Sequence, residues 1–373
     1  MRVSSALTVD ASSHRVPAAL PVSPALAQQT SVIVVAHNSG SFLQDCVASI
    51  RQTQPEVEVV VVDNASTDGA VGRLKAEFPA LSLVESTRNL GFGAGCNLGA
   101  ARAKGAFLAF INPDAVVADG WLEALVRPLA EDPWVGLVTP KVLLRDDPDR
   151  INVAGLNVHL SGISMCRGLG TSRATLDEAA EVAAVSGVAF AVRRDLFEAV
   201  GGFDEDFFLY MEDVDLSVRT WLAGYRCLYV PSAVVSHDYD QVEVDARKTF
   251  WVERGRYLML LKAFRPRTLV ALLPTLLLVE AITWGWLLWR NPKAILQKLR
   301  AWQWVLAHRA QIAEKRHQVQ ACRTAPDTAF LARCQRHLDF AQLAGPRMAR
   351  AAQVIFAPLF RGAGGMLRLA TGR

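Results

Sequence analysis

Acidic side chains are concentrated in one short stretch of the chain. The segment 204–215 holds six acidic residues among twelve, interleaved with aromatic residues. Carboxylates this close repel one another unless a cation, a substrate hydroxyl or the start of a helix uses them. Aromatic surroundings also raise the pKa of a carboxylate toward the range that suits a general base. Helix capping accounts for one or two of these acids, but not obviously for Glu212, Asp213 and Asp215 together.

A second candidate site follows a short β-branched run. Asp63 comes directly after the run 57–62 and precedes Asn64. A carboxylate at the end of a buried strand can accept hydrogen bonds from a nucleobase or a ribose. Helix capping by Ser66 or Asp68 is the structural alternative, and without further evidence it is the better interpretation of this segment.

A third candidate site combines an acid with a distant histidine. Asn112-Pro113-Asp114 follows the apolar run 106–111, and Asp114 can offer oxygen to a hard divalent cation. His237 comes after another apolar run and can complete such a metal site, leaving the other positions to phosphate oxygens and water. An Asx-type turn at Asn-Pro-Asp and a purely structural histidine are the alternatives.

The elements that must position these residues alternate along the chain. Continuous apolar runs predict buried strands, and helical spacing or a glycine-rich turn separates each run from the next. This βαβα order predicts an α/β fold with a mostly parallel sheet covered by helices on both faces. The candidate residues then meet at the carboxyl ends of the strands, where open α/β sheets bind ligands. The predicted strands are 31–36, 57–62, 81–85 and 106–111, and the predicted helices are 41–52, 70–78 and 91–104.

The chain divides into regions of different composition. Residues 1–29 hold no long apolar run and are interpreted as a flexible tail. Residues 30–245 form the predicted α/β domain, with a first half at 30–135 and a less regular second half at 136–245. The remainder, 246–373, is basic and apolar, and is interpreted as a helical region.

Charge is distributed unevenly along these regions. The net charge is only +4, but residues 247–373 hold 22 Lys and Arg against five Asp and Glu. Such a tail suits an anionic surface, and its Trp-rich apolar character favours lipid over nucleic acid. Six scattered cysteines without a CxxC pair indicate neither a disulfide framework nor a zinc cluster, which fits a reducing compartment.

The tail contains one stretch long enough to cross a bilayer. Residues 269–289 lack Lys, Arg and Asp, although Glu280 lies near the middle and basic residues flank both ends. Residues 293–320 show the spacing of one amphipathic surface helix. We therefore expect membrane association, by spanning or by docking in the membrane plane. The alternative to membrane association is an apolar helical subdomain packed on the first domain or on a second subunit.

Taken together, these motifs resemble the family-2 glycosyltransferases of the GT-A fold, especially bacterial rhamnosyltransferase-like members. The resemblance covers about 30–245 and, less specifically, the tail to about 320. Each motif is short, but their order and spacing are specific. The motifs that carry it are Ser31–Asn38, Val60–Asp68, Asn89-Leu90-Gly91-Phe92, Phe110–Asp114, Gly201-Gly202-Phe203-Asp204, Phe208–Leu216 and His237.

The resemblance implies a role for each matching residue. Asp213 corresponds to the catalytic base, with Glu212 beside it. Asp114, with His237, would ligate Mg2+ or Mn2+, because Asn112-Pro113-Asp114 occupies the place of the Asp-X-Asp motif. The first acid of that motif is Asn here, so most of the coordination would come from the donor diphosphate. The implied donor-binding residues are His37, Asn38, Asp63, Asn64, Asn89, Gly91 and Asn112, and the implied acceptor-binding residues are Ser186 and Gly187.

The resemblance thus implies a metal-dependent, inverting glycosyltransferase acting in bacterial cell-surface polysaccharide synthesis. It would move rhamnose or a similar sugar from a nucleotide-diphosphate donor to a glycan or lipid-linked acceptor at the cytoplasmic face of the cell membrane. A homo-oligomer is left open. The competing hypotheses are a catalytically silent membrane-bound scaffold and a nucleotidyltransferase of related fold; a nucleic-acid binder fits the Trp-rich tail least.

Overall fold

A computed structural model describes residues 26–239, 246–342, 347, 349–350 and 352–360. The predicted flexible tail falls outside these residues as far as position 25. Its last residues form the short 3-10 helix η1 (Leu26–Gln29), which leads directly into the first strand.

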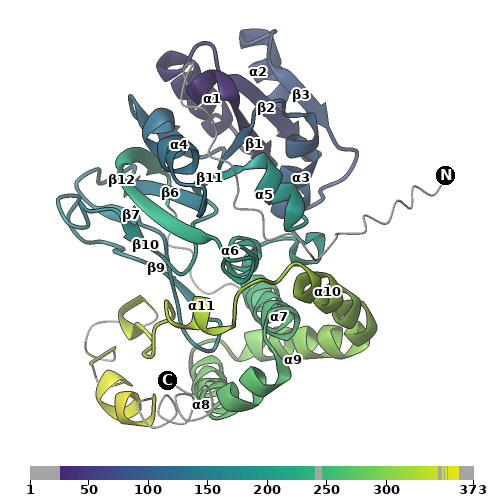
Figure 1. Ribbon diagram of the computed structural model, residues 1–373, viewed down its shortest axis with the longest axis vertical. Helices are drawn as coiled ribbons and strands as arrows, with labels where there is room; N and C mark the ends of the chain where they lie inside the picture. Colours follow the sequence, from purple (N-terminus) through teal and green to yellow (C-terminus); the bar gives the residue numbers. More distant parts are fainter. Residues whose placement is uncertain (1–25, 240–245, 343–346, 348, 351, 361–373) are drawn as a thin grey trace.

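One sheet of ten strands organises the described part of the chain (Figure 1). Its strand order is β10-β12-β6-β11-β4-β1-β2-β3, with β5 beside β12 and β7 beside β6. β3, β2, β1 and β4 are parallel, and β11 runs antiparallel to β4 and β6. The mostly parallel sheet predicted from the sequence is confirmed. The strands are β1 (Thr30–Ala36), β2 (Glu58–Asp63), β3 (Ser82–Glu85), β4 (Phe107–Ile111), β5 (Ala115–Val117), β6 (Val135–Leu144), β7 (Ile151–Val153), β10 (Ala180–Glu181), β11 (Ala189–Arg193) and β12 (Arg226–His237), and β8 (Leu156–Val158) and β9 (Ser164–Cys166) pair separately.

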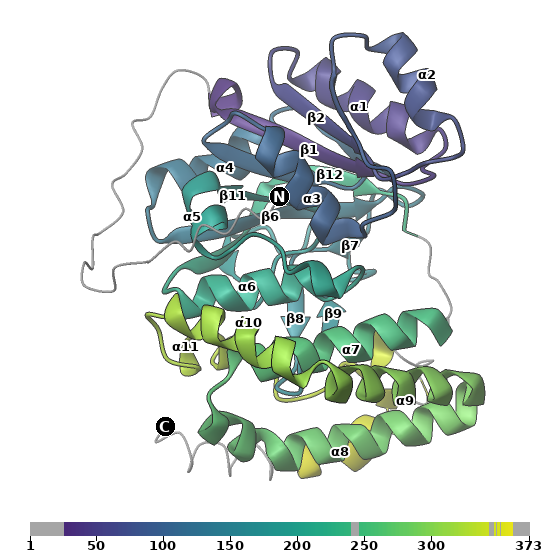
Figure 2. The same ribbon diagram turned by 90° about the vertical axis from the view of Figure 1, so that its right-hand side faces the viewer.

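Helices lie on both sides of this sheet, as Figure 2 shows for α1 and α2 on one side and α6 on the other. Every residue of β1 is buried, which is why its sequence is a continuous apolar run rather than an alternating one. The helices of this part are α1 (Phe42–Thr53), α2 (Ala70–Glu77), α3 (Phe92–Arg102), α4 (Trp121–Glu131), α5 (Arg194–Ala199), η2 (Glu205–Phe207) and α6 (Glu212–Leu222).

Helices after residue 245 form a layer below the sheet part (Figure 2). α7 packs against α9, α10 and α6, and α8 lies on the outer side of the layer. The single amphipathic helix expected over 293–320 is wrong, because the chain turns at His308 and divides there into two helices. These elements are α7 (Ala246–Ala263), α8 (Pro266–Arg290), α9 (Pro292–Ala307), α10 (Arg309–Ala321), α11 (Thr328–Leu331) and η3 (Phe340–Gln342).

A buried ion network joins the first three of these helices. Arg256 of α7 contacts both Glu253 and Glu280, and Lys298 of α9 lies 3.0 Å from each of the same two carboxylates. Both cationic side chains are fully buried. Glu280 therefore has two cationic partners inside the protein, and Lys298, which belongs to the basic residues that follow the 269–289 stretch, is an interior residue.

Candidate active site

The loops after β1 and β2 hold each other through short polar contacts. Asn38 has a φ of 53°, and its Oδ1 accepts from the backbone N–H of Thr67 at 2.8 Å. His37 Nδ1 lies 2.9 Å from the carbonyl oxygen of Asn64 and keeps its ring exposed. One carboxylate oxygen of Asp63 accepts from the backbone N–H of Ser66 at 2.8 Å. Asp63 thus shapes its own loop, and the contact with the start of α2 is made by Asp68, whose Oδ1 accepts from Ala70 N–H at 3.1 Å.

Asn64 is a buried clamp for the next loop. Its Oδ1 accepts from Leu90 N–H at 2.8 Å, and its Nδ2 donates to Gly91 O at 3.0 Å and to Asn89 Oδ1 at 3.1 Å. The residue is 2% exposed. The Asn64 amide therefore holds the 89–91 loop at the sheet edge. Neighbouring residues, rather than Asn64 itself, are the ones that can contact a ligand directly.

Gly91 brings this loop against the segment that leads into α6. Its φ is 84°, and a Cβ placed there would lie 2.2 Å from the carbonyl oxygen of Phe208. The same oxygen accepts from Phe92 N–H at 2.8 Å. Only glycine permits this approach, so the loop after β3 and the acidic segment 204–215 meet in direct contact.

Asp213, in the first turn of α6, reaches the end of the central sheet. Its Oδ2 accepts from Gly187 N–H at 2.9 Å, and the next residue, Val188, accepts from Asn112 N–H at 2.8 Å. The Asp213 carboxylate is thus attached next to the Asn112–Asp114 turn. Ser186 is buried, and its Oγ accepts from Val188 N–H at 3.3 Å.

Glu212 and Asp213 differ in how their charge is supported. Burial, reinforced by the neighbouring Asp213 and Asp215, raises the pKa of Glu212 to about 8. Burial also raises the pKa of Asp213, but hydrogen bonds from the N–H groups of Gly187 and Val214 oppose that shift. At neutral pH Glu212 therefore carries a proton, and Asp213 is the acid of the pair whose charged form is stabilised by two backbone N–H groups.

The backbone before these two acids is strained. Phe208 has φ 62° and ψ −56°, and Leu209 N–H donates to Phe207 O at 2.7 Å, which defines a classic γ-turn. Tyr210 and Met211 follow with φ of 65° and 72°. Each such residue costs about 1–3 kcal/mol unless its surroundings hold it. The turn 207–211 is therefore an imposed conformation that delivers Asp213 to the sheet edge.

Asp114 and His237 lie together, as the sequence analysis predicts. Asp114 Oδ1 is 3.3 Å from His237 Nε2, and His237 Nδ1 is 3.0 Å from Asn152 Oδ1. In the tautomer whose Nδ1–H donates to Asn152, Nε2 presents a lone pair to a carboxylate oxygen. Asp114 Oδ1 is itself buried and makes no hydrogen bond. Two acceptor atoms facing each other suit a shared cation, and the described residues bring no third His, Cys, Asp or Glu to it.

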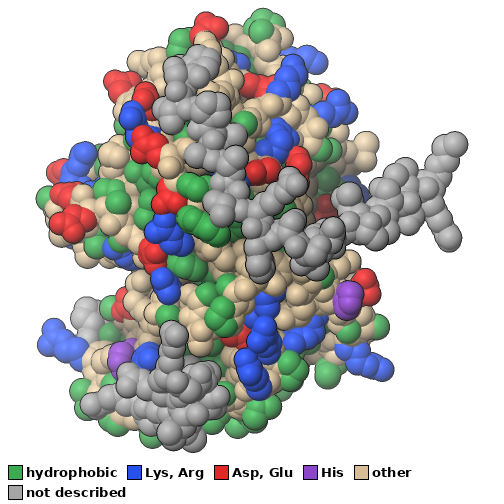
Figure 3. Space-filling view, viewed as in Figure 1, with side chains coloured by type: hydrophobic (Ala, Val, Ile, Leu, Met, Phe, Trp, Pro, Cys, Tyr) green, Lys and Arg blue, Asp and Glu red, His purple; other side chains and the backbone are tan. Residues whose placement is uncertain are grey.

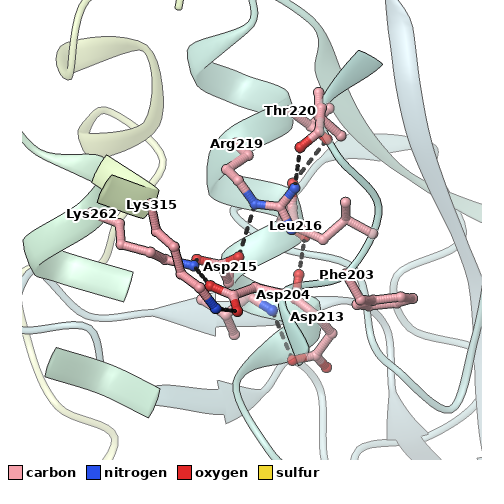
Figure 4. Close-up of polar contacts among 12 residues, drawn as sticks. Phe203, Asp204, Asp213, Asp215, Leu216, Arg219, Thr220, Lys262 and Lys315 are labelled. Carbon is pink, nitrogen blue, oxygen red and sulfur yellow. Dashed lines mark hydrogen bonds and ion pairs between the residues drawn. The ribbon is translucent and has the colours of Figure 1, made fainter. Parts of the chain in front are cut away.

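Three other acids of the 204–215 segment, Asp204, Asp206 and Asp215, bind the helical layer (Figure 4). Lys262 pairs with Asp204 and lies 3.0 Å from Asp215, and Lys315 pairs with Asp204 and Asp206. In the close-up Asp204 and Asp215 face the two lysines, whereas the Asp213 carboxylate points away from them. Half of the acidic cluster therefore forms ion pairs that join the sheet part of the molecule to the helical layer.

A cavity of about 420 Å³ lies among these pairs, lined by Phe203, Asp204, Arg219, Lys262 and Lys315 among others. None of the residues predicted to bind donor, metal or acceptor lines it. The candidate active site is instead the sheet edge that carries the loops ending β1, β2 and β4 together with Asp213.

Contacts thus link most of the predicted positions: Asn64 to the 89–91 loop, that loop to Phe208, and Asp213 through Gly187 and Val188 to Asn112. Asn152, the partner of His237, was missed because its short strand carries no motif. Arg254 and Trp251, which contact the strained turn, were missed because helical spacing does not reveal contacts with a distant loop.

Known proteins resemble this chain in sequence and in fold. The family described as Glycosyl transferase family 2 matches residues 31–201. The chain is 32% identical over 235 residues to the N-acetylglucosaminyl-diphospho-decaprenol L-rhamnosyltransferase of Mycobacterium tuberculosis, covering 55% of this chain and 75% of that protein. It is 31% identical over 231 residues to the pre-mycofactocin glycosyltransferase of the same organism, covering 60% of this chain and 46% of that protein.

Solved structures share the fold at lower sequence identity. A mannosyltransferase from Pyrobaculum calidifontis, in complex with GDP-Man and Mn2+, aligns with a TM-score of 0.50 at 23% identity, covering 92% of this chain and 89% of that chain. S. aureus TarS 1–349 in complex with UDP-GlcNAc aligns with a TM-score of 0.52 at 19% identity, covering 82% and 91%. These likenesses identify the sheet and its helices as the GT-A fold.

Proposed function

We propose that this chain, which belongs to glycosyl transferase family 2, transfers a hexosyl group with inversion from a nucleoside-diphosphate donor to a hydroxyl of a lipid-linked or glycan acceptor. The finer assignment is a rhamnosyltransferase of bacterial cell-surface polysaccharide synthesis. The relative that supports it is 32% identical and is a rhamnosyltransferase.

The observation that carries the proposal is the placement of Asp213. Its carboxylate hydrogen-bonds Gly187, next to the residue that holds the Asn112–Asp114 turn. In the proposed step the acceptor oxygen forms a bond to the anomeric carbon and its proton passes to Asp213. The bond from that carbon to the diphosphate oxygen breaks, and its electron pair leaves with the nucleoside diphosphate. A single carboxylate in this role performs one displacement, which inverts the anomeric centre.

Asp114 and His237 are the residues that would hold a divalent cation. Their facing acceptor atoms fit Mg2+ or Mn2+, and a two-residue site leaves coordination positions for the donor diphosphate. Such an ion supplies charge stabilisation for the departing diphosphate. Asn152 keeps the His237 ring oriented through Nδ1.

The donor nucleoside would lie over the loops after β1 and β2. The exposed His37 ring would stack on the base, and Asp63 has one carboxylate oxygen outside its bond to Ser66. The 89–91 loop, fixed by Asn64, would border the sugar diphosphate. Ser186 and Gly187 would line the acceptor side, because Gly187 contacts Asp213 directly.

A panel of nucleotide sugars tests the function. We expect dTDP-L-rhamnose or a UDP-sugar to be transferred to a short-chain polyprenyl diphosphate N-acetylglucosamine in the presence of Mg2+ or Mn2+. NMR of the product should show the opposite anomeric configuration to the donor. Absence of transfer and of hydrolysis across the whole panel would favour the scaffold alternative, and retention of configuration would contradict Asp213 as the sole base.

We further propose that the enzyme docks on the cytoplasmic face of the membrane through α8, lying in the membrane plane. Among the described residues α8 is the single helix with the length and hydropathy to cross a bilayer, with a mean hydropathy of 1.7. Val270, Leu273, Leu277 and Leu288 share one side of it and are 49–70% exposed. Glu280, on the buried side, is tied to Arg256 and Lys298. Extracting α8 into a spanning orientation would break those pairs, which favours in-plane docking.

The exposed stripe on α8 has basic ends that suit anionic lipid. Arg267 and Arg290 are both exposed, one at each end of α8. On the face shown in Figure 3, acidic side chains lie mostly over the upper part of the molecule, away from this helix. Apolar area between basic residues is the pattern of an interfacial helix.

Liposome flotation tests this docking. The chain should float with vesicles containing an anionic lipid, and Leu273→Glu with Leu277→Glu should abolish flotation. Trp134→Glu, at an exposed apolar residue outside α8, is the matched control and should float normally. A double variant that still floats would contradict the proposal. A fall in molecular mass of the double variant in light scattering would instead assign the stripe to a second copy of the chain.

A further inference from the structure

The strained turn 207–211 needs support from outside its own sequence. Three of its five residues have positive φ without being glycine. A backbone of this kind persists only where neighbouring structure fixes it. Its contact with the 89–91 loop fixes one side, through Phe208 O. The other side of the turn faces α7.

Arg254 of α7 reaches the start of this turn. Its Nη2 donates to the carbonyl oxygen of Phe207 at 2.6 Å and also to that of Asp206. The residue is 5% exposed. Its guanidinium carbon lies 4.4 Å from the ring centroid of Trp251 and 4.7 Å from that of Trp304. The two rings fix the plane of the guanidinium, and hence the direction of its N–H groups.

Other contacts from α7 press on the same turn. The Phe208 ring stacks on Trp251 with centroids 4.7 Å apart. A Cβ at Gly255 would lie 2.9 Å from Met211 Cβ, so the helix backbone itself abuts the turn. The turn therefore lies between the 89–91 loop and α7, with Phe208 touching both.

We propose that Arg254 is a positioning residue for catalysis. By tying the carbonyl groups of Asp206 and Phe207 to α7, it keeps the γ-turn at Phe208 closed and the Asp213 carboxylate against Gly187. This inference rests on the proposed role of Asp213 as base. It assigns to the helical layer a part in the chemistry that is separate from any membrane contact.

Arginine is required here for its geometry as well as its charge. Burial lowers the pKa of Arg254 to about 10, so the side chain remains cationic at neutral pH. Lysine would keep a charge but would lose the planar fork between two rings. Arg254→Lys is therefore expected to behave more like Arg254→Ala than like the wild type in catalysis, while disturbing packing less.

Arg316 offers a matched control. It also donates to two backbone carbonyls of the helical layer, those of Leu261 at 2.6 Å and Phe264 at 2.5 Å, without touching the turn. Arg316→Ala removes a comparable set of bonds. We expect it to lower the melting temperature as Arg254→Ala does, but to leave turnover unchanged.

Hydrogen exchange of the ligand-free protein tests the inference without any substrate. Peptides covering 204–213 should exchange faster in Arg254→Ala and Arg254→Lys than in the wild type or Arg316→Ala, while peptides from β1 and β2 stay unchanged. Unchanged exchange over 204–213 in folded Arg254→Lys would overturn the proposal. So would equal acceleration across all of α7 and α9, because that pattern reports general loosening.

Kinetics supply the second measurement. With dTDP-L-rhamnose and the short-chain acceptor, kcat of both Arg254 variants should fall on the order of 10- to 100-fold, as expected for a misplaced base. Binding of dTDP should stay within about twofold, and added guanidinium should partly restore turnover of Arg254→Ala. Unchanged kcat would overturn the inference. If the wild type transfers nothing from this donor, the rhamnosyl assignment fails instead, and hydrogen exchange still decides the role of Arg254.

Discussion

The sheet edge and the helical layer use polar residues in opposite ways. At the edge, amides and backbone groups hold loops open to ligands, as Asn64 holds the 89–91 loop. In the layer, fully charged side chains are buried in pairs, as Arg256 and Lys298 are with Glu280. The layer also carries most of the exposed large apolar side chains described, eleven of fourteen lying after residue 269. The sheet edge thus presents polar loops to solvent, whereas the layer buries ion pairs and exposes most of the large apolar side chains.

This contrast implies that substitutions in the two regions have different consequences for activity and stability. Loops held by neutral hydrogen bonds lose little stability when one side chain changes, because each bond contributes only about 0.5–1.5 kcal/mol. A buried ion pair that loses one partner leaves an uncompensated charge. Changes at the sheet edge should therefore remove chemistry and spare the fold, whereas changes inside the layer should remove stability and spare ligand binding.

The sharpest test of the edge is Asp213→Asn. Transfer should fall by at least about a thousandfold, because the amide cannot accept the acceptor proton. The melting temperature and the dTDP affinity should stay close to wild type. Initial rates measure transfer, calorimetric titration measures dTDP affinity, and thermal unfolding gives the melting temperature. Asp132→Asn, at a surface acid that contacts Arg226 and the backbone N–H of Trp134, is the control. Near-normal turnover by Asp213→Asn would remove the enzyme mechanism proposed here.

The corresponding test of the layer is Glu280→Ala. It leaves Arg256 and Lys298 sharing only Glu253, and we expect a loss of about 3–5 kcal/mol in the free energy of unfolding. Urea denaturation followed by Trp fluorescence measures this loss. Glu314→Ala, at an exposed acid of α10, should cost almost nothing. Weakened dTDP binding by folded Glu280→Ala would break the contrast between the two regions.

Asp114→Ala probes the metal side of the edge. Donor binding should weaken about 10- to 100-fold in the presence of Mn2+, and the dependence on Mn2+ should largely disappear. Titration of dTDP with and without a chelator measures both effects, with Asp119→Ala, at an exposed acid of the following loop, as control. Equal affinities for wild type with and without chelator would contradict a cation held by Asp114 and His237.

Glu212→Gln should give the smallest effect, and one that depends on pH. The pKa of Glu212 is about 8 in the folded chain, against 4.5 for an ordinary glutamate side chain. The folded state therefore keeps a proton that the unfolded state releases, and stability falls as pH rises between those values. Glutamine removes this penalty, so the melting temperature of the variant should gain a few degrees relative to wild type at pH 8.5 and little at pH 4.5. A constant difference across this range would contradict the raised pKa.

Much of the sheet edge could be predicted from the sequence, because the chemistry there follows strand ends directly. Asp63 and Asp114 stand one and three residues after apolar runs, and a parallel sheet brings such positions to one edge. The contact between Asp114 and His237 follows from strand pairing, since His237 ends a strand in which it pairs with Ala115, the residue after Asp114.

The rest depends on partners far apart in the chain. No feature of the sequence near Glu280 indicates Lys298 as its partner, so the sequence alone presents this acid only as a cost of membrane insertion. β12 continues through Pro231 to His237 by means of an irregularity between Val230 and Val234, where local rules predict a strand end. The γ-turn at Phe208 is likewise imposed by tertiary contacts against the preference of the residue.

The meeting of Gly91 with Phe208 limits how the enzyme can be redesigned. Any residue with a Cβ at position 91 would clash with the carbonyl oxygen of Phe208. If the 89–91 loop borders the sugar as proposed, attempts to change sugar preference by editing it would also disturb the alignment of Asp213, the proposed base. Libraries that vary both segments together should yield active variants more often than libraries that vary either one alone.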